Sequence, residues 1–531
     1  MKIRFIEPKP MGAHVFNTAA LPRLGAPLMA TMLAERGHDV RVYVQSLAPV
    51  DWDDVTSADL VGISTTTATA PAGYAIADGL KYVGVPTVMG GSHVTFVPDE
   101  ALDHCNYVVR GEGHFAIHEL VEVLEGGRDA GDVAGLSYRE RDGRILHNEA
   151  RQSCSLEEFQ GLPWPDLSLV VGHENMFTKP MMTQWGCPYN CDFCSVIKMF
   201  GRQMRYRTVD DILRQLHLRY RGENIFFYDD NFLANRRRSV ELMRRMVGED
   251  TEVYWGAQVR ADSVYLNRAT REVDHELLGL MRDSGCFTVY VGFESVNPEA
   301  LKAYNKQQDV ATIIDSIKAF HQYDIKIHGM FVLGSDADTV ESIRGTVDFA
   351  VEQGIDTVQF LVLTPAPGTA YYERMVAEGR LITRDWTLYD GHHVVARTMN
   401  MSPYELQVEA IRAMSRFYSA GEVTRAYAGN ILRTAPFFAG LLVRDVRLSI
   451  NLPKIAIEAL LPRRRSGVLS ELQRLVGYKD WSKILRRFGP LALRSSNHQL
   501  LEQWARQPWS ALHLERLKLI PALAKKPLPS A

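Results

Sequence analysis

Short apolar runs alternate with helical patterns along the first 150 residues of the chain. The runs predict strands at Ile3–Glu7, Asp39–Val44, Leu60–Ser64, Thr87–Met89 and Tyr107–Val109. An amphipathic helix is expected at Gly25–Arg36, where apolar residues recur at helical spacing until Gly37. Such alternation of strands and helices predicts a parallel, doubly wound, Rossmann-like domain over residues 1–150.

Several of these strands end in turns made of small residues. Ligands of an open parallel sheet bind beyond the carboxyl ends of its strands, where such turns let the backbone approach closely. Turn geometry alone explains any one of them, but three turns on one sheet edge favour a ligand site. The candidate residues are Ser64, Thr65, Gly90, Gly91, His93, Gly111 and Glu112.

A second alternating series starts at residue 181. Its predicted strands are Met181–Trp185, Asn224–Tyr228, Val253–Val259, Phe287–Phe293, Lys326–Leu333 and Thr357–Leu363. Helical patterns fill the gaps, for example at Val209–Arg221, His275–Asp283, Ala311–Tyr323 and Val340–Gln353. Six such units predict a partial (β/α)6 barrel over residues 181–400, with its chemistry at the carboxyl ends of the strands.

Two regions lack this alternation. Residues 151–180 contain three prolines and no clear periodicity, and are interpreted as a linker. Beyond residue 400 the strand pattern disappears, and prolines divide residues 401–531 into short pieces with helical patterns. The chain is therefore expected to be α/β for most of its length, with a C-terminal helical region.

Composition narrows the class of protein. The chain has 531 residues, of which 46% are hydrophobic and 23% charged, so disordered and disulfide-stapled classes are excluded. No apolar run approaches the roughly 18 residues that a membrane span needs. The N-terminal residues lack the apolar core of a signal peptide, and the cysteine pattern is not a secreted framework, so a cytoplasmic location is expected.

The net charge of −3 conceals an uneven distribution. Residues 421–531 carry a net charge of +12, which leaves −15 for the other 420 residues. Apolar stretches lie beside basic ones in this tail, as where Ile455–Leu461 precedes Arg463, Arg464 and Arg465. Basic amphipathic helices suit an anionic membrane surface, here the inner face of the membrane. The charge would also fit nucleic acid, although no such partner is expected, or a helical cap on the acidic barrel.

Three of the six cysteines fall within eight residues, directly after the first strand of the second series. They are Cys187, Cys191 and Cys194. Thiolates are soft ligands that suit zinc or iron–sulfur clusters. A structural zinc site would need a fourth ligand, and the paired spacings typical of zinc are absent. Three cysteines on one loop suit a [4Fe–4S] cluster that leaves one iron open.

This Cys-x-x-x-Cys-x-x-Cys motif, with Phe193 before its last cysteine, resembles that of the radical SAM superfamily. The resemblance implies that Cys187, Cys191 and Cys194 each bind one iron, and that Phe193 lies near S-adenosylmethionine (SAM). The fourth iron would chelate the amino and carboxylate groups of SAM. An electron from the cluster would then cleave SAM to a 5′-deoxyadenosyl radical. The electron would come from a reductase, a flavodoxin or a ferredoxin.

Further SAM contacts are implied by the same resemblance at the ends of later strands. Asp229 and Asp230 would contact the methionine amino group, Arg260 the carboxylate, and Glu294 a further group of SAM. Gly329 and Gly334 bracket the fifth predicted strand, and their loops would shape the adenine and substrate pockets. Polar strand ends and a barrel-rim ion pair are the ordinary structural alternatives.

The N-terminal domain resembles the cobalamin-binding domain that many radical SAM enzymes carry. The likeness rests on Pro22–Gly25 before a helix, on Gly90–Phe96 and on Val108–Gly113. It implies that the seven turn residues named above bind cobalamin. The Asp-x-His-x-x-Gly motif that supplies a histidine to cobalt is absent, so cobalamin without a protein histidine ligand is expected. A domain that has lost its corrin is the alternative.

Together these likenesses imply methyl transfer from methylcobalamin to an unactivated carbon. The segment from Asp385 to Pro403 resembles the same part of bacterial lipid-modifying members such as hopanoid methylases, which implies a small apolar, lipid-like or isoprenoid substrate. The alternatives are cyclisation or C–C bond formation on a lipid, tetrapyrrole or secondary metabolite. A more distant one is a non-catalytic iron–sulfur or cobalamin sensor.

Overall fold

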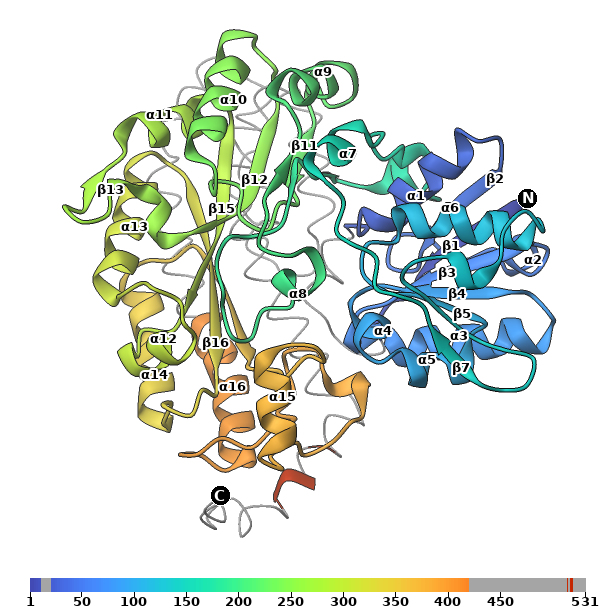
Figure 1. The fold of residues 1–531 in the computed structure, drawn as a ribbon. Coiled ribbons are helices and arrows are strands. Elements are labelled where there is room, and N and C mark those ends of the chain that lie inside the picture. The colour runs from blue at the N-terminus through green and yellow to red at the C-terminus, as the bar shows by residue number, and fades with distance from the viewer. Residues whose placement is uncertain (11–20, 420–512, 514–515, 519–531) are drawn as a thin grey trace, which may run out of the picture.

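A computed structural model describes residues 1–10, 21–419, 513 and 516–518. Two α/β units lie side by side in it (Figure 1). The basic tail expected to meet a membrane or to cap the barrel falls outside the described residues, apart from His513 and 516–518.

The N-terminal unit is built on a seven-stranded sheet with the order β2-β1-β3-β4-β5-β6-β7. Its first five strands are parallel and lie where the sequence predicts them: β1 (Lys2–Glu7), β2 (Asp39–Val44), β3 (Leu60–Ser64), β4 (Thr87–Gly90) and β5 (Tyr107–Val109). The alternation of apolar runs and helices therefore identifies the doubly wound core correctly.

Two strands of this sheet escape the sequence pattern. β6 (Leu136–Arg139) and β7 (Ile145–His147) pair antiparallel at the edge of the sheet, beyond β5. Only the first two residues of β6 are buried, and β7 is half-exposed, so neither carries an apolar run. Antiparallel edge strands of this kind need only one covered face.

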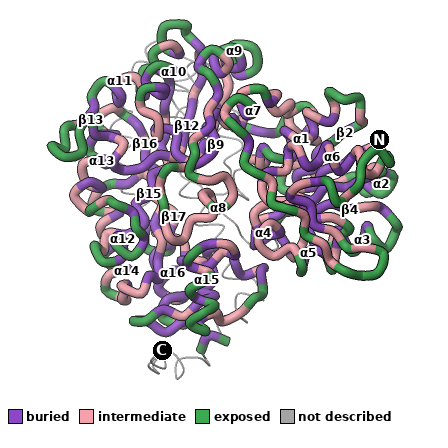
Figure 2. The backbone as a smooth tube through the Cα atoms, viewed as in Figure 1, coloured by how far each residue is buried: buried purple, intermediate pink, exposed green. Residues whose placement is uncertain are grey.

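Helices cover both faces of the N-terminal sheet (Figures 1 and 2). α1 (Gly25–Ala34) and α6 (Gly113–Leu124) pack on one face through Ala30, Leu33 and Leu120. α3 (Ala70–Tyr82) and α5 (Pro98–His104) pack on the other through Tyr74, Leu80 and Leu102. The strands between them are buried on both sides, as a parallel sheet requires.

The second unit is a parallel six-stranded sheet with the order β17-β16-β15-β12-β11-β8. Its strands are β8 (Thr178–Met181), β11 (Asn224–Phe227), β12 (Tyr254–Arg260), β15 (Cys286–Glu294), β16 (Lys326–Leu333) and β17 (Thr357–Val362). Since β8 and β17 stand at opposite ends of this order, the six units form the open partial barrel that the sequence predicts.

The helices of this unit begin at side-chain caps. Thr208, Asp274, Asp309 and Thr339 accept hydrogen bonds from the first turns of α9 (Val209–Arg219), α11 (His275–Asp283), α13 (Val310–Gln322) and α14 (Val340–Glu352). α10 (Arg236–Gly248) is capped by Asn235. These helices bury their apolar faces against one continuous core around the sheet.

The helical region after the barrel begins as part of the same unit. α16 (Pro403–Phe417) packs against α14 and β17, and its Leu406 and Phe417 join the core of the sheet. The hydroxyl of Tyr418 donates to the Val358 carbonyl at 2.5 Å and accepts from the Val358 N–H at 2.9 Å. The first helix of the predicted C-terminal region thus covers the last strand of the barrel.

The first strand of the barrel differs from the prediction. The expected strand Met181–Trp185 is split: β8 ends at Met181, and β9 (Gln184–Trp185) pairs instead with β10 (Arg205–Tyr206). The cause is Asp229, whose carboxylate accepts from the Thr183 and Gln184 N–H groups at 2.6 and 3.1 Å and so turns the chain out of the sheet. β8 also begins at Thr178, within the predicted 151–180 linker, which further contains α7 (Leu156–Gly161).

Candidate functional site

The cysteine loop follows β9 and lies beyond the carboxyl ends of the barrel strands. Cys187, Cys191 and Cys194 are free, half-buried thiols. Burial raises the pKa of all three thiols, that of Cys194 to about 12. Cys191 raises the pKa values of both other thiols, and Cys187 raises that of Cys194. Three thiols on one short loop are a donor set that fits a [4Fe–4S] cluster, whose binding would release their protons.

The first half of the loop is held by Arg260 and Arg268. The guanidinium of Arg260 lies 3.8 Å from the centre of the Tyr189 ring, and Arg268 donates to the Tyr189 hydroxyl at 2.6 Å. Asn305 donates to the Asn190 carbonyl at 2.9 Å. Side chains at or beyond the ends of β12 and α12 (Pro298–Ala303) therefore position the segment between the first two cysteines.

The second half of the loop is held from α15 (Ala370–Ala377) and α12. Arg374 pairs with Asp192 at 2.8 Å, and the Tyr371 N–H donates to the Asp192 carbonyl at 3.3 Å. Phe193 meets the Tyr304 ring edge-on at 5.4 Å. The structure therefore places Phe193 in an apolar cluster beside Tyr304 and Tyr371, where it positions Cys194.

The two aspartates after β11 have different surroundings. Asp229 is fully buried, and burial raises its pKa while Thr183, Gln184 and Arg238 stabilise its charged form. Its oxygens are thus engaged in holding the β8–β9 turn. Burial, followed by the charge of Asp229, raises the pKa of Asp230 to about 7. Asp230 accepts a hydrogen bond from the Gly186 N–H and raises the pKa values of Cys187 and Cys194, so it is the aspartate beside the start of the cysteine loop.

Glu294 ends β15 and forms a buried ion pair with Lys306 at 2.6 Å. Its backbone has a φ of +60°, a left-handed conformation that is uncommon for glutamate. A side chain at Gly292 would come within 2.6 Å of Glu294 Oε1 and 2.8 Å of Lys306 Nζ. The missing side chain of Gly292 therefore gives this ion pair its room at the end of the strand.

Three other predicted SAM residues have structural partners. Arg260 donates to both oxygens of Asp262 at 3.1 and 3.2 Å, and to the Lys306 carbonyl at 2.6 Å. Gly329 does not bracket the fifth strand but lies inside β16, where a Cβ would come within 3.2 Å of Phe293. Gly334 follows β16 with a φ of +95°, and a Cβ there would meet Leu406 of α16 at 2.6 Å. These glycines allow close packing where they lie.

The turns after β3 and β4 form a cradle at the edge of the N-terminal sheet. Gly91 has a φ of +104°, and a side chain there would come within 2.2 Å of the Thr65 carbonyl oxygen. The Thr65 N–H donates to the Gly90 carbonyl at 2.9 Å, and Arg23 donates to the Ser64 carbonyl at 2.8 Å. Gly111 after β5 has a φ of +76° and open space around it. Backbone turns without side chains fit a flat, bulky ligand such as a corrin.

His93 lies behind this cradle and is fully buried. Its Nε2 is 3.1 Å from the Tyr74 hydroxyl, and its Nδ1 is 3.4 Å from the Thr67 hydroxyl. Trp386 packs against its ring at 5.0 Å and donates to Glu100 at 2.7 Å. Both ring nitrogens of His93 therefore face side chains of the same unit.

Glu112 links the two units. Its Oε1 accepts from Arg205 of β10 at 2.5 Å, and its Oε2 accepts from the Cys154 N–H at 2.8 Å. The side chains of Arg205 and Glu112 are 1% and 4% exposed, so the pair is buried. Arg205 lies opposite Trp185, just before the cysteine loop. A turn at the predicted cobalamin edge is thereby joined to the strand that carries the cluster cysteines.

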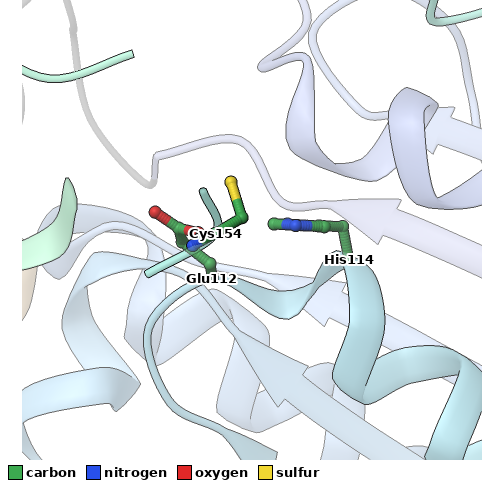
Figure 3. Close-up of side chains that lie close together, drawn as sticks. All are labelled: Glu112, His114 and Cys154. Carbon is green, nitrogen blue, oxygen red and sulfur yellow. Dashed lines mark hydrogen bonds between the residues drawn. The ribbon is translucent and has the colours of Figure 1, made fainter. Parts of the chain in front are cut away.

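Glu112, His114 and Cys154 converge at the start of α6 (Figure 3). Their ligand atoms lie within 4.8 Å of one another and all three are buried, a donor set that could hold a metal ion. Arg205 already provides positive charge there, because it also donates to the Cys154 sulfur at 3.1 Å. Burial, with the charge of Arg205, lowers the pKa of His114 to about 4. The negative charge of Glu112 in this group of three side chains is therefore balanced by the Arg205 guanidinium.

Sequence reasoning missed Tyr189, Arg205 and Lys306. Tyr189 lies inside the recognised motif, but nothing in the sequence indicates that two arginines contact its side chain. Arg205 and Lys306 are buried only because carboxylates distant in sequence meet them. Charged residues are rarely buried unless paired, so their role becomes visible only in the fold.

Two family models match the chain. Residues 181–350 match the Radical SAM superfamily, and residues 18–121 match the B12 binding domain. A protein of Pyrococcus horikoshii, named as an uncharacterized methyltransferase, is 30% identical over 438 residues, which is 79% of this chain and 92% of that protein. Both domain types expected from the sequence are thus confirmed.

Other relatives carry more specific names. The bacteriochlorophyllide d C-12(1)-methyltransferase of Chlorobaculum tepidum is 26% identical, with 83% of this chain and 92% of that protein covered. The hopanoid C-2 methylase of Rhodopseudomonas palustris is 27% identical, with 69% and 66% covered.

A solved structure shares the fold. The cobalamin-dependent SAM radical enzyme OxsB, with aqua-cobalamin and SAM bound, has a TM-score of 0.62 at 16% identity and covers 99% of this chain and 81% of that one. Among the described residues, no helix is both long and apolar enough to cross a membrane.

Proposed function

Because the chain belongs to the radical SAM superfamily and carries a B12 binding domain, we propose that this enzyme transfers a methyl group to an unactivated carbon of a small apolar substrate. Its cofactors are a [4Fe–4S] cluster, SAM and cobalamin. When bound, the cluster supplies the electron that cleaves SAM, and cobalamin carries the methyl group.

The proposal rests on contacts that join the cradle edge of the N-terminal sheet to the cysteine-loop edge of the barrel. Segments that follow strand ends in one unit contact segments that follow strand ends in the other, through Glu112 with Arg205 and through Glu100 with Trp386. A side chain at Gly368, after β17, would come within 2.4 Å of the Phe96 ring, after β4. These contacts support a common space for the cradle and the cysteine loop.

The residues have separate tasks in this proposal. Cys187, Cys191 and Cys194 bind the cluster, and the clamps on Tyr189 and Asp192 fix the loop that carries them. Asp230 would accept from the amino group of SAM. The turns at Gly91 and Gly111 admit the corrin, as do Ser64, Thr65 and Gly90, whereas His93 and Glu112 support the turns from behind.

The substrate is proposed to be a lipid or isoprenoid. The hopanoid relative and the segment 385–403 support it. The bacteriochlorophyllide relative supports a tetrapyrrole as the second candidate. A flavodoxin or ferredoxin, or a reductase, is proposed as electron donor, and the basic residues 421–531 as a peripheral contact with an anionic membrane.

The test is anaerobic reconstitution of the full chain, followed by detection of 5′-deoxyadenosine from SAM. Cys191→Ala should abolish the product, whereas Cys105→Ala, which alters a buried cysteine far from the loop in sequence, should not. Product formation by Cys191→Ala would overturn the cluster assignment. Protein purified from cells grown with cobalamin should contain corrin, and its absence would overturn the B12 role.

Methyl transfer is tested with SAM that carries a trideuteromethyl group. Lipid and tetrapyrrole extracts are supplied as separate substrates, and the products are analysed by mass spectrometry. Label in a lipid product supports the proposed substrate class, and label only in a tetrapyrrole replaces it with the second candidate. A product that has lost hydrogen but gained no label would identify a cyclase instead.

A further inference from the structure

The inner face of the barrel sheet carries side chains that have no role in the cysteine loop or the cradle. Alternate residues of a strand point to opposite faces of its sheet. One set of them is buried in the core beneath the helices and includes Phe227, Ala257, Val291 and Phe331. The residues next to these therefore face the inside of the barrel, and they are half-exposed: Tyr228, Gln258, Tyr290, Met330 and Val332.

Three polar side chains lie side by side on this inner face. Gln258 of β12 pairs in register with Tyr290 of β15, and Tyr228 follows Phe227 of β11, which pairs with Ala257. No described residue forms a hydrogen bond with either tyrosine hydroxyl or with the amide group of Gln258. Burial raises the pKa of each tyrosine to about 12, so both hydroxyls stay protonated at neutral pH. The three groups can therefore form hydrogen bonds with a ligand without carrying charge.

Aromatic contacts hold the two tyrosines in place. The ring of Phe226 meets Tyr228 edge-on at 5.7 Å and Tyr290 edge-on at 5.1 Å. Gly256 pairs with Phe226 on the strand between them and has no side chain to separate these rings. Tyr290 also contacts the ring of His328 at 4.8 Å. Side chains fixed in this way lose little freedom when a ligand binds.

The charges around the inner face disfavour an anionic ligand. Each of three nearby cations lies against a carboxylate: Arg260 against Asp262, Lys306 against Glu294, and Arg23 against Glu7. Asp230, two residues after Tyr228, adds a carboxyl group on the same face of the sheet. An anion would lose its water there without gaining an unpaired cation, whereas an uncharged polar group needs only hydrogen bonds.

Beyond His328, β16 presents apolar side chains to the inside of the barrel. Met330 and Val332 follow His328 on the same face and are half-exposed. Val332 also packs against the apolar cluster that contains Tyr304, next to Phe193 of the cysteine motif. An apolar surface therefore leads from the two tyrosines towards the cysteine loop.

We propose that Tyr228, Gln258 and Tyr290 determine substrate specificity by binding one uncharged polar group, a hydroxyl or a carbonyl oxygen, of an otherwise apolar substrate. The apolar body of the substrate then lies along Met330 and Val332. This inference rests on the proposed radical SAM function and narrows its substrate class to a neutral lipid-like molecule. Carboxylates and phosphate esters are excluded from the inner face, because no unpaired cation meets them there.

The experiment compares phytanol, phytanic acid and phytane, which share one branched hydrocarbon skeleton and differ only in the end group. Each tritiated ligand is supplied from cyclodextrin to the anaerobically reconstituted full-length enzyme, and bound ligand is counted after rapid gel filtration. Wild type should bind phytanol about 10-fold more tightly than phytane, because only phytanol can form the hydrogen bonds. It should discriminate at least as strongly against phytanic acid, which is ionised at neutral pH.

Single hydroxyl deletions test the two tyrosines. Tyr228→Phe and Tyr290→Phe should each weaken phytanol binding about 2- to 10-fold, as expected for one neutral hydrogen bond, and leave phytane binding unchanged. Tyr220→Phe is the matched control, because Tyr220 is buried in the core beneath the helices, and it should leave all three affinities unchanged. Gln258→Lys adds an unpaired cation beside the tyrosines and should shift the preference from phytanol to phytanic acid.

The iron content and the electron paramagnetic resonance signal of the reduced cluster report whether each variant is correctly assembled. Should Gln258→Lys fail to assemble, the two tyrosine variants decide. Equal affinity of the wild type for phytanol and phytanic acid would overturn the inference, as would binding of none of the three ligands. An unchanged preference for phytanol in both tyrosine variants would overturn it too. Wild type that forms no 5′-deoxyadenosine from SAM would instead overturn the proposed function, so the two failures are distinguishable.

Discussion

Neutralising Glu112 is expected to destabilise the protein more than most single substitutions. Glu112→Gln keeps the shape of the side chain but removes the charge that balances Arg205. Both side chains are nearly inaccessible, at 4% and 1% exposure, and the pair is 2.5 Å long. Leaving one partner of a buried ion pair uncompensated costs about 3–5 kcal/mol. We expect a loss of that size in the free energy of unfolding.

The measurement is urea unfolding followed by tryptophan fluorescence and circular dichroism, with Glu140→Gln as the control. Glu140 pairs with Arg144 at 2.7 Å on the surface, where such pairs contribute about 0–1 kcal/mol. The double variant Glu112→Gln with Arg205→Met should recover part of the loss, because it leaves no buried charge. A loss below about 1 kcal/mol for Glu112→Gln would refute the reasoning.

Three further perturbations test other parts of the site. Gly91→Ala should cost more unfolding free energy than Gly84→Ala and should reduce bound corrin. Both variants place a Cβ at a positive φ, which costs about 1–3 kcal/mol, but only at Gly91 would the Cβ also meet the Thr65 carbonyl oxygen. Tyr189→Leu should lower the iron bound after reconstitution, since Arg260 and Arg268 lose their hold on the loop, whereas equal iron content would contradict the clamp. Burial lowers the pKa of His328 to about 4. The histidine of the unfolded chain therefore binds a proton at a higher pH than the histidine of the folded protein, and the free energy of unfolding should fall as the pH drops from about 6.5 to 4. His328→Asn, which can still reach Thr357, should weaken this dependence in urea titrations at several pH values, and an unaltered slope would speak against it.

The parts of the fold that follow from local periodicity are predictable from the sequence. Five strands of the N-terminal sheet and five of the barrel lie close to the predicted ranges, because buried parallel strands are apolar on both faces. β8 is different, because its end is decided by Asp229, a residue distant in sequence that binds the N–H groups of Thr183 and Gln184. The local pattern of apolar and polar residues cannot predict these two hydrogen bonds.

The candidate site likewise has one part that the sequence predicts and one part that only the fold reveals. The cysteine motif is recognisable because one short loop carries all three ligands. The partners of Arg260 and Lys306 are not, because these two cations differ only in the carboxylates that meet them. Arg260 donates to both oxygens of Asp262, whereas the Lys306 ammonium donates to Glu294. Which carboxylate a buried cation meets is a property of tertiary contacts.

Two contacts between the units fix the position of the cradle relative to the cysteine loop. Bound SAM and cobalamin would supply their chemistry from different units, so a productive encounter would require a fixed distance between the cradle and the cysteine loop. Glu112 and Arg205 join the units near the cysteine loop, while Glu100 and Trp386 join them near the end of the barrel. Two separated contacts resist rotation where a single one would act as a hinge. The buried ion pair and the tryptophan contact therefore hold the N-terminal unit against the barrel at two separate places.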